Sequence, residues 1–169
     1  RCAMVFQNST LFDSMTLLDN VALPIRKHFD MSLKQARAEA RKKLALVDME
    51  DEAERYPADF GDGMRKKVAI ARALTLDPEF VIFDEPTTGI DPISANIVDR
   101  LIRDLSDRLG VTSIVVSHDL RSIFGVADRV AMLYQGQFII DGPPQALRDS
   151  SDPIVQQFIN GRPDGPMEV

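Results

Sequence analysis

The sequence at residues 80–86 reads Phe-Val-Ile-Phe-Asp-Glu-Pro: four apolar side chains, then two carboxylates. A short apolar run without alternation predicts a strand buried on both faces, as in a parallel sheet covered by helices. Ligands of such sheets bind beyond the carboxyl ends of the strands. Asp84 is therefore placed to hold Mg²⁺ and Glu85 to accept a proton from an attacking water, as phosphoryl transfer requires. The alternative is a strand that ends in a solvated acidic turn.

Composition limits the class of protein. The 169 residues are 44% hydrophobic and 27% charged, as in a soluble globular domain of ordinary size. The net charge of −6 and the absence of a Lys/Arg block argue against nucleic acid as the main partner. Cys2 is the only cysteine, which excludes an intrachain disulfide, and no apolar run approaches the roughly 20 residues of a membrane span. The start at Arg1, directly before a strand-like run, predicts a chain cut from a longer protein.

Patterns typical of strands and helices flank residues 80–86. Strands are expected at 3–6, 80–83 and 112–116, and a helix at 92–109 lies between the last two, capped by Asp91 and followed by Gly110. A strand, a helix and a strand of these lengths predict a βαβ unit with parallel pairing. The predicted apolar stripe of the helix consists of Ile93, Ile97, Leu101, Leu105 and Leu109, widened by Val98 and Ile102. Residues 130–134 and 137–140 flank Gln135-Gly136, which predicts a β-hairpin.

Residues 8–78 form a mostly helical insert between the first two strands. Ser32 and Gln35 form a capping-box pattern that opens one helix. Its predicted apolar face consists of Leu33, Ala36, Ala40, Leu44 and Val47. A second helix is expected from about Met64 to Leu74. Its basic residues are expected to form a solvated face, not a nucleic-acid site; they are Arg65, Lys66, Lys67 and Arg72.

Polar residues follow all three predicted parallel strands. Gln7 follows the first strand, Asp84 and Glu85 the second, and His118 the third. The sheet topology brings these ends to one edge, where an amide, two carboxylates and an imidazole would form a site for a metal ion and phosphates. Taken alone, Gln7 is an ordinary loop residue and His118 a capping or packing histidine.

Other motifs keep the same order along the chain. Tyr56-Pro57-Ala58 precedes the segment 63–74, and Thr88-Gly89-Ile90-Asp91 follows the Asp84 strand. With Gln7 as a Q-loop residue, 80–85 as a Walker B strand and His118 as a switch histidine, the chain resembles the nucleotide-binding subunit of ABC transporters. Residues 83–92 and the tail 152–166 are most similar to the ATPases of Mla-type phospholipid-trafficking importers.

The resemblance implies an α/β fold: a P-loop NTPase-like three-layer core with a mostly parallel sheet and a helical ABC subdomain. The core would comprise 1–7 and 79–149, the helical subdomain 8–78 and a C-terminal tail 150–169, with the N-terminal part of the core missing.

It also implies ATP and Mg²⁺ as ligands. Asp84 and Gln7 would hold the ion, Glu85 would be the general base and His118 would steady the γ-phosphate. Asp91 would couple two sites across a dimer of ATPase subunits. The other partner would be a transmembrane permease, which places the protein peripherally on the cytoplasmic face of the cell membrane.

The chain departs from the family by lacking a G-x-x-x-x-G-K-[ST] phosphate-binding loop. The 169 residues alone are therefore expected to be inactive. One alternative function is a non-catalytic fragment that retains only surfaces for partners. Another is a soluble ABC ATPase of translation or DNA repair, but no second core or long coiled-coil insert is visible in the sequence.

The signature loop is also altered. The family's Leu-Ser-Gly-Gly appears as Phe60-Gly61-Asp62-Gly63, so a hydroxyl donor is absent and a negative charge is added. In the family, the loop's N–H groups bind the γ-phosphate held by the other subunit. Asp62 would either oppose that phosphate or turn away and cap the following helix.

Overall fold

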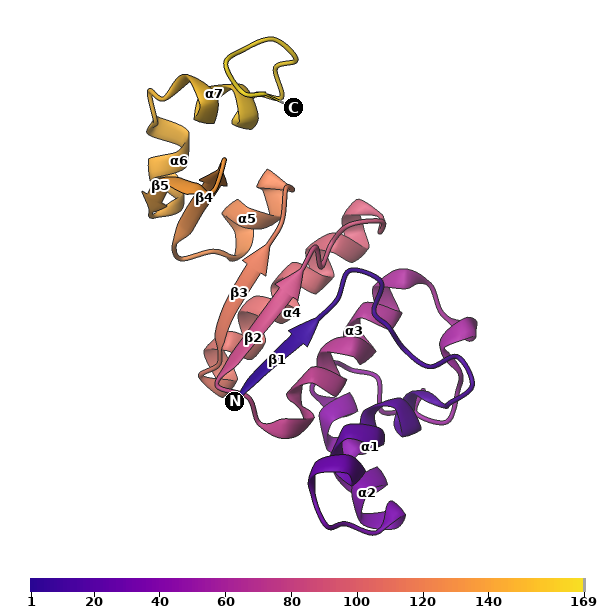
Figure 1. Cartoon of the computed structure of the whole chain (residues 1–169). Helices are drawn as coiled ribbons and strands as arrows, with labels where there is room; N and C mark the ends of the chain where they lie inside the picture. The colour runs from indigo at the N-terminus through magenta and orange to yellow at the C-terminus, as the bar shows by residue number, and fades with distance from the viewer. Residues whose placement is uncertain (169) are drawn as a thin grey trace. The chain divides into compact units, whose positions relative to one another are not determined.

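The computed structural model describes residues 1–168 and divides into two compact units, Arg1–His118 and Asp119–Val169. The first unit contains a parallel sheet and most of the helices, and the second contains a hairpin with short helices (Figure 1). Among the described residues, no helix has the length and apolar character needed to cross a membrane.

Three parallel strands form the sheet of the first unit. β1 (Cys2–Val5), β2 (Phe80–Asp84) and β3 (Thr112–Val116) lie in the order β1-β2-β3. Val5 pairs with Phe83, and Asp84 pairs with Val116. The predicted strands and their parallel pairing are confirmed, and the carboxyl ends of all three strands lie at one edge (Figure 1).

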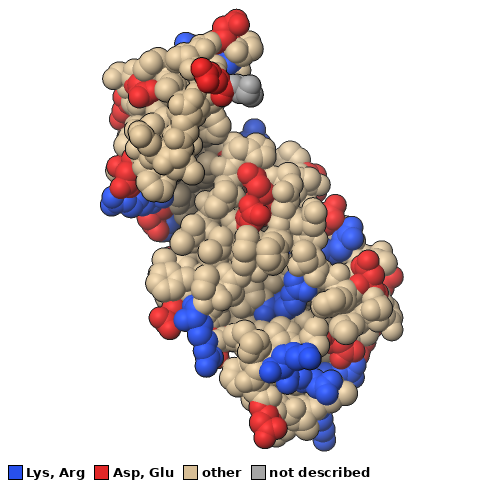
Figure 2. Space-filling view, in the orientation of Figure 1, with Lys and Arg blue, Asp and Glu red and all other residues tan. Residues whose placement is uncertain are grey.

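One face of this sheet is buried and the other is exposed. Val81 and Phe83 are buried, whereas Phe80, Met4 and Ile114 are exposed. The prediction that the β2 run is buried on both faces is therefore wrong for this chain: Val81 is 1% exposed and Phe80 44%. The helices of the unit cover one face only, and Figure 2 shows that the surface over the strands is largely uncharged.

Helix α4 (Pro92–Leu109) connects β2 to β3 and begins and ends as predicted. The Asp91 carboxylate accepts hydrogen bonds from the first backbone N–H groups, and Gly110 ends the helix with a φ of 65°. Its buried stripe consists of Val98, Ile102 and Leu105. The predicted apolar stripe is partly wrong. Residues spaced four apart do not stay on one face of a helix that has 3.6 residues per turn. Ile93 and Ile97 consequently lie on the exposed side.

The insert between β1 and β2 contains α1 (Leu17–His28), α2 (Leu33–Ala45), η1 (Pro57–Asp59), α3 (Asp62–Ala73) and η2 (Leu74–Leu76). The Ser32–Gln35 capping box of α2 is confirmed, and all of its predicted apolar face is buried except Leu33. α1 has no counterpart among the helices predicted by sequence, since Pro24 interrupts the pattern. Buried Asn20 fastens the preceding loop: its amide accepts from the N–H of Phe12 and donates to the carbonyls of Phe12, Met15 and Thr16.

The second unit comprises α5 (Leu120–Val126), β4 (Val130–Tyr134), β5 (Gln137–Gly142), α6 (Pro144–Asp149) and α7 (Pro153–Ile159). β4 and β5 pair antiparallel, which confirms the predicted hairpin. Its two turn residues, Gln135 and Gly136, both have positive φ, as a type I′ turn requires. Val130, Leu147 and Val155 form the core of this unit.

The burial pattern of α4 predicts a difference between two isoleucines on the same helix. Ile102 is fully buried and Ile97 is 48% exposed. Ile102→Ala should lower the free energy of unfolding by about 2–5 kcal/mol, because it leaves a cavity in the core. Ile97→Ala should lower it by about 0.5 kcal/mol or less. Urea unfolding of both variants tests this, and equal losses would contradict the packing described here.

Candidate catalytic site

The carboxylate of Glu85 lies at the centre of the polar edge of the sheet. Its Oε1 atom is 2.8 Å from Nδ1 of His118, beyond the end of β3. Thr88 Oγ1 donates to Oε2 at 2.8 Å, and Ser117 Oγ lies 3.4 Å from the same oxygen. The structure therefore brings together Glu85 and His118, as the sequence predicts, and adds two hydroxyl groups that sequence reasoning did not assign to the carboxylate.

The backbone at Glu85 is held in an unusual conformation. Its φ is 46°, a left-handed value that is uncommon for residues other than glycine. The Glu85 N–H donates to the carbonyl of Val116 at 2.9 Å, and the Thr88 N–H donates to the Glu85 carbonyl at 3.3 Å. These bonds hold the left-handed turn that directs the side chain toward His118.

The surroundings of Glu85 favour its ionised form. Burial raises the pKa of this carboxyl, but hydrogen bonds from His118 and Thr88 outweigh burial and lower the pKa below its usual value. Glu85 is consequently a carboxylate at neutral pH, which is the form a general base requires.

The burial of Lys66 is the largest difference between the structure and the sequence prediction. Only 2% of this residue is exposed, and its Nζ donates to the carbonyl of Gln7 at 2.5 Å and to that of Glu85 at 3.2 Å. Burial lowers the pKa of Lys66, and the nearby carboxylates of Asp62, Glu85 and Asp84 act in the opposite direction. A signal for this burial was available in the sequence, because Lys66 lies one helical turn before Ile70 on the apolar side of α3.

Two other basic residues of α3, Lys67 and Arg72, also contact neighbouring segments of the chain. Arg72 donates to the carbonyls of Ser9 and Thr10 and to the Thr10 hydroxyl, and burial lowers its pKa. Lys67 lies 4.0 Å from a carboxylate oxygen of Asp48. The prediction of a solvated basic face is therefore wrong for Lys66, Lys67 and Arg72, which contact neighbouring segments of the chain. Arg65 pairs with Asp62 within α3 and stays partly exposed.

Asp84 and Gln7 are the predicted metal ligands. Asp84 is half-buried in β2 and Gln7 is exposed just beyond β1. A carboxylate and a side-chain amide supply oxygen atoms, the ligand type that Mg²⁺ takes, so the residues present fit this ion. Within residues 1–168, no cluster of three or more His, Cys, Asp or Glu side chains could hold a metal.

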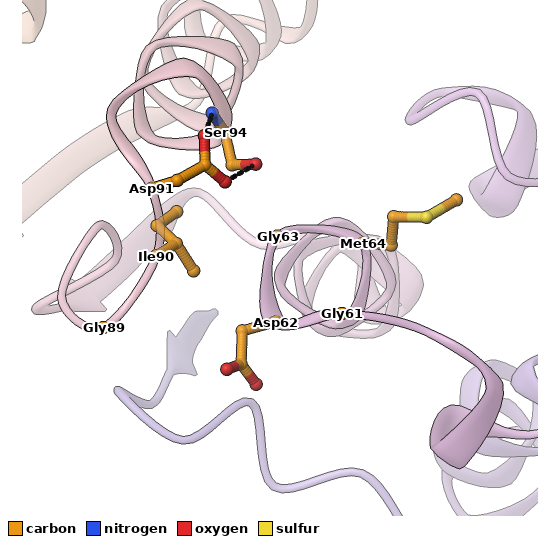
Figure 3. A pocket seen from close by; sticks show the side chains of 8 residues that line it. All are labelled: Gly61, Asp62, Gly63, Met64, Gly89, Ile90, Asp91 and Ser94. Carbon is orange, nitrogen blue, oxygen red and sulfur yellow. Dashed lines mark hydrogen bonds between the residues drawn. The ribbon is translucent and has the colours of Figure 1, made fainter.

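The altered signature loop lines a second feature, a pocket of about 370 Å³ (Figure 3). Its residues are Gly61, Asp62, Gly63, Met64, Gly89, Ile90, Asp91 and Ser94. Hydrogen bonds from the Ser94 hydroxyl and from the α4 backbone hold the pKa of Asp91 below its usual value. The pocket thus lies between the signature loop and residues 88–91, the motif that follows the Asp84 strand and resembles the family's D-loop.

Asp62 does not cap the helix that follows it. Gly61 is the N-cap of α3, and Asp62 is the first residue of the helix. The Asp62 carboxylate forms an ion pair of 2.9 Å with Arg65 and points away from Asp91 (Figure 3). The capping alternative is therefore wrong, and the charge lies in the first turn of the helix, partly neutralised by Arg65.

Gly63 permits α3 to lie close to the start of α4. A Cβ added at Gly63 would lie 3.0 Å from Ser94 Cβ and 3.1 Å from its Oγ. Gly63→Ala should lower the free energy of unfolding by about 1–3 kcal/mol, because Ser94 must shift. The matched control is Gly125→Ala in α5, where a Cβ meets no atom within 4 Å.

That control should leave stability unchanged or raise it by up to about 0.5 kcal/mol, because alanine is favoured over glycine in a helix and Gly125 lies near the end of α5. Thermal unfolding of the two variants makes the comparison. A gain in stability from Gly63→Ala would show that the two helices are not packed as closely as described.

Comparisons with known proteins agree with this geometry. A family model described as ABC transporter matches residues 1–88. The intermembrane phospholipid transport system ATP-binding protein MlaF of Escherichia coli (strain K12) is 38% identical over 167 residues, which cover 99% of this chain and 62% of MlaF. The probable ribonucleotide transport ATP-binding protein mkl of Mycobacterium bovis is 37% identical over 97% of this chain and 46% of its own length.

A solved structure shows the same fold. A dimeric post-hydrolysis state of the ATP-binding cassette MJ0796, bound to ADP and Pi, superposes with a TM-score of 0.73 at 28% identity. The match covers 85% of this chain and 63% of the cassette. The chain therefore spans less than two thirds of the length of these curated and solved relatives.

Proposed function

The chain belongs to the ABC transporter family, and we propose that the protein is the ATP-hydrolysing motor subunit of an ABC transporter. The observation that carries the proposal is the ionised Glu85 carboxylate in contact with His118 at the carboxyl edge of the sheet. The ATP-binding names of the relatives also favour a motor over a non-catalytic interaction protein.

The proposed chemistry assigns a role to each residue at the edge. Glu85 accepts the proton of the water that attacks the γ-phosphate of ATP. Its two oxygens already accept from neighbours, but an ionised carboxylate offers about four lone-pair positions, so acceptor capacity for a water remains. His118 steadies the γ-phosphate from the neighbouring strand end. Asp84 and Gln7 hold Mg²⁺, which supplies neutralising charge to the phosphates.

The proposal includes partners and cargo. A second ATPase subunit completes each nucleotide site, because in the family the signature loop binds the γ-phosphate held by the other subunit. Residues 8–58 contact a transmembrane permease, which keeps the subunit at the cytoplasmic face of the membrane. The cargo is a phospholipid or another hydrophobic molecule. The name of MlaF and the dimeric state of the MJ0796 cassette support this part of the proposal.

Replacing the proposed base tests the function directly. In the full-length natural protein, Glu85→Gln should lower the kcat of ATP hydrolysis by about 100-fold or more, because an amide does not take up the proton. ATP binding should persist, so that a dimer with bound ATP accumulates in size-exclusion chromatography. The matched control is Glu39→Gln on α2, where the glutamate pairs only with Lys42 in the described contacts. Normal turnover of Glu85→Gln beside an active wild type would remove Glu85 as the base.

The altered signature loop provides a second test. The double variant Gly61→Ser/Asp62→Gly restores a hydroxyl and removes a negative charge at the start of α3. It should tighten ATP binding in the dimer by about two- to fivefold, which is the size of charge effects at helix ends. Arg65→Ala should act in the opposite direction, because it leaves the Asp62 charge without its ion-pair partner. Equilibrium binding of ATP measures both, and an unchanged affinity in both variants would show that the charge of Asp62 has no influence.

A further inference from the structure

The buried ammonium of Lys66 lies between two adjacent strand ends. Val5 of β1 pairs with Phe83 of β2, and Gln7 and Glu85 each follow two residues later. The parallel register therefore brings the carbonyls of Gln7 and Glu85 to equivalent positions beyond the sheet. Lys66, which reaches them from α3, donates to both.

A cation in this position is costly, so its partners matter. Removing a lysine side chain from water carries a penalty unless polar groups replace its hydration. The two carbonyls replace part of it, and the carboxylates of Asp62, Asp84 and Glu85 act on the same charge. Without the ammonium, both carbonyls would lose a hydrogen bond at a partly buried position.

The carbonyl that Lys66 holds at Glu85 belongs to the left-handed turn described above. A peptide carbonyl and the side chain of the same residue share one backbone, so fixing the carbonyl limits the directions open to the Glu85 carboxylate. Lys66 itself lies on the helix that begins at the signature loop, one turn after Asp62. One side chain therefore connects the signature helix to both segments of the hydrolytic edge.

We propose that Lys66 is a positioning residue that sets the backbone of Gln7 and Glu85 for hydrolysis and couples α3 to the hydrolytic site of its own chain. This inference rests on the proposed ATPase function. It assigns Lys66 no contact with the nucleotide, so its removal should affect the chemical step more than the binding of ATP.

The experiment compares ATPase variants of the full-length natural protein. Lys66→Met keeps a long unbranched side chain without the donors, and should lower kcat by about 10- to 100-fold, as misplacement of a catalytic group does. The KM and the equilibrium affinity for ATP should change by less than about threefold, because nucleotide contacts remain. Lys66→Arg keeps the charge and the donors, and should recover most of the lost kcat.

Lys43→Met is the matched control. Lys43 is a largely buried lysine on α2 that pairs with Asp77, away from the sheet edge. The Lys43→Met variant should keep kcat within about twofold of the wild-type value, because no catalytic group is displaced. If Lys66→Met does not fold, Lys66→Gln, which keeps an N–H donor, takes its place with the same expected split between kcat and KM.

A double variant separates positioning from a general loss of structure. If Lys66 acts through Glu85, adding Lys66→Met to Glu85→Gln should lower the residual kcat by no more than about twofold, since groups that act together are not additive. A full multiplicative loss, or a Lys66→Met protein with wild-type kcat, would overturn the positioning role alone. A wild-type protein without ATPase activity would instead overturn the proposed function, and this inference with it.

Discussion

The parallel pairing of β2 with both β1 and β3 fixes where the polar groups of the site lie. It brings the ends of three chain segments to one edge of the sheet, although Gln7 and Glu85 are more than 70 residues apart in the sequence. Glu85 leaves this edge in a left-handed turn, and His118 and Thr88 then hold its carboxylate. A shift of one residue in either pairing would separate these groups, because neighbouring residues of a strand point to opposite faces.

Two basic side chains of helix α3 bind the backbone of neighbouring segments in the first unit. Lys66 reaches the backbone at both Gln7 and Glu85, and Arg72 reaches the loop at Ser9 and Thr10. Both side chains bind carbonyl oxygens, which are fixed backbone groups, and not mobile carboxylates. Lys66 and Arg72 therefore hold segments next to the site from within the chain, and their charged groups are occupied by these contacts.

The signature loop differs from the family pattern at Gly61 and Asp62, and its backbone still forms the start of α3. Gly63 still allows α3 to approach Ser94, and Gly61 still opens the helix in an extended conformation. Asp62 adds a charge in the first turn that Arg65 partly neutralises. Asp62 thus brings a negative charge to the lining of the pocket that this loop forms with Asp91.

Local patterns of apolarity, capping and turn residues predicted the strands at β2 and β3, the caps of α2 and α4, the hairpin, and the polar residues that end the strands. The sequence also predicted that the parallel sheet brings Glu85 and His118 to one edge, where the structure shows them in contact. The exposure of Phe80 follows from which distant segment covers the side chain, and only the folded chain shows that. Helix periodicity puts Ile97 outside the buried stripe of α4 and Lys66 on the apolar side of α3, but it does not show that two carbonyls meet the charge of the lysine. A lysine is polar in any window of sequence, but two carbonyls brought together by strand pairing can replace the water around its charge.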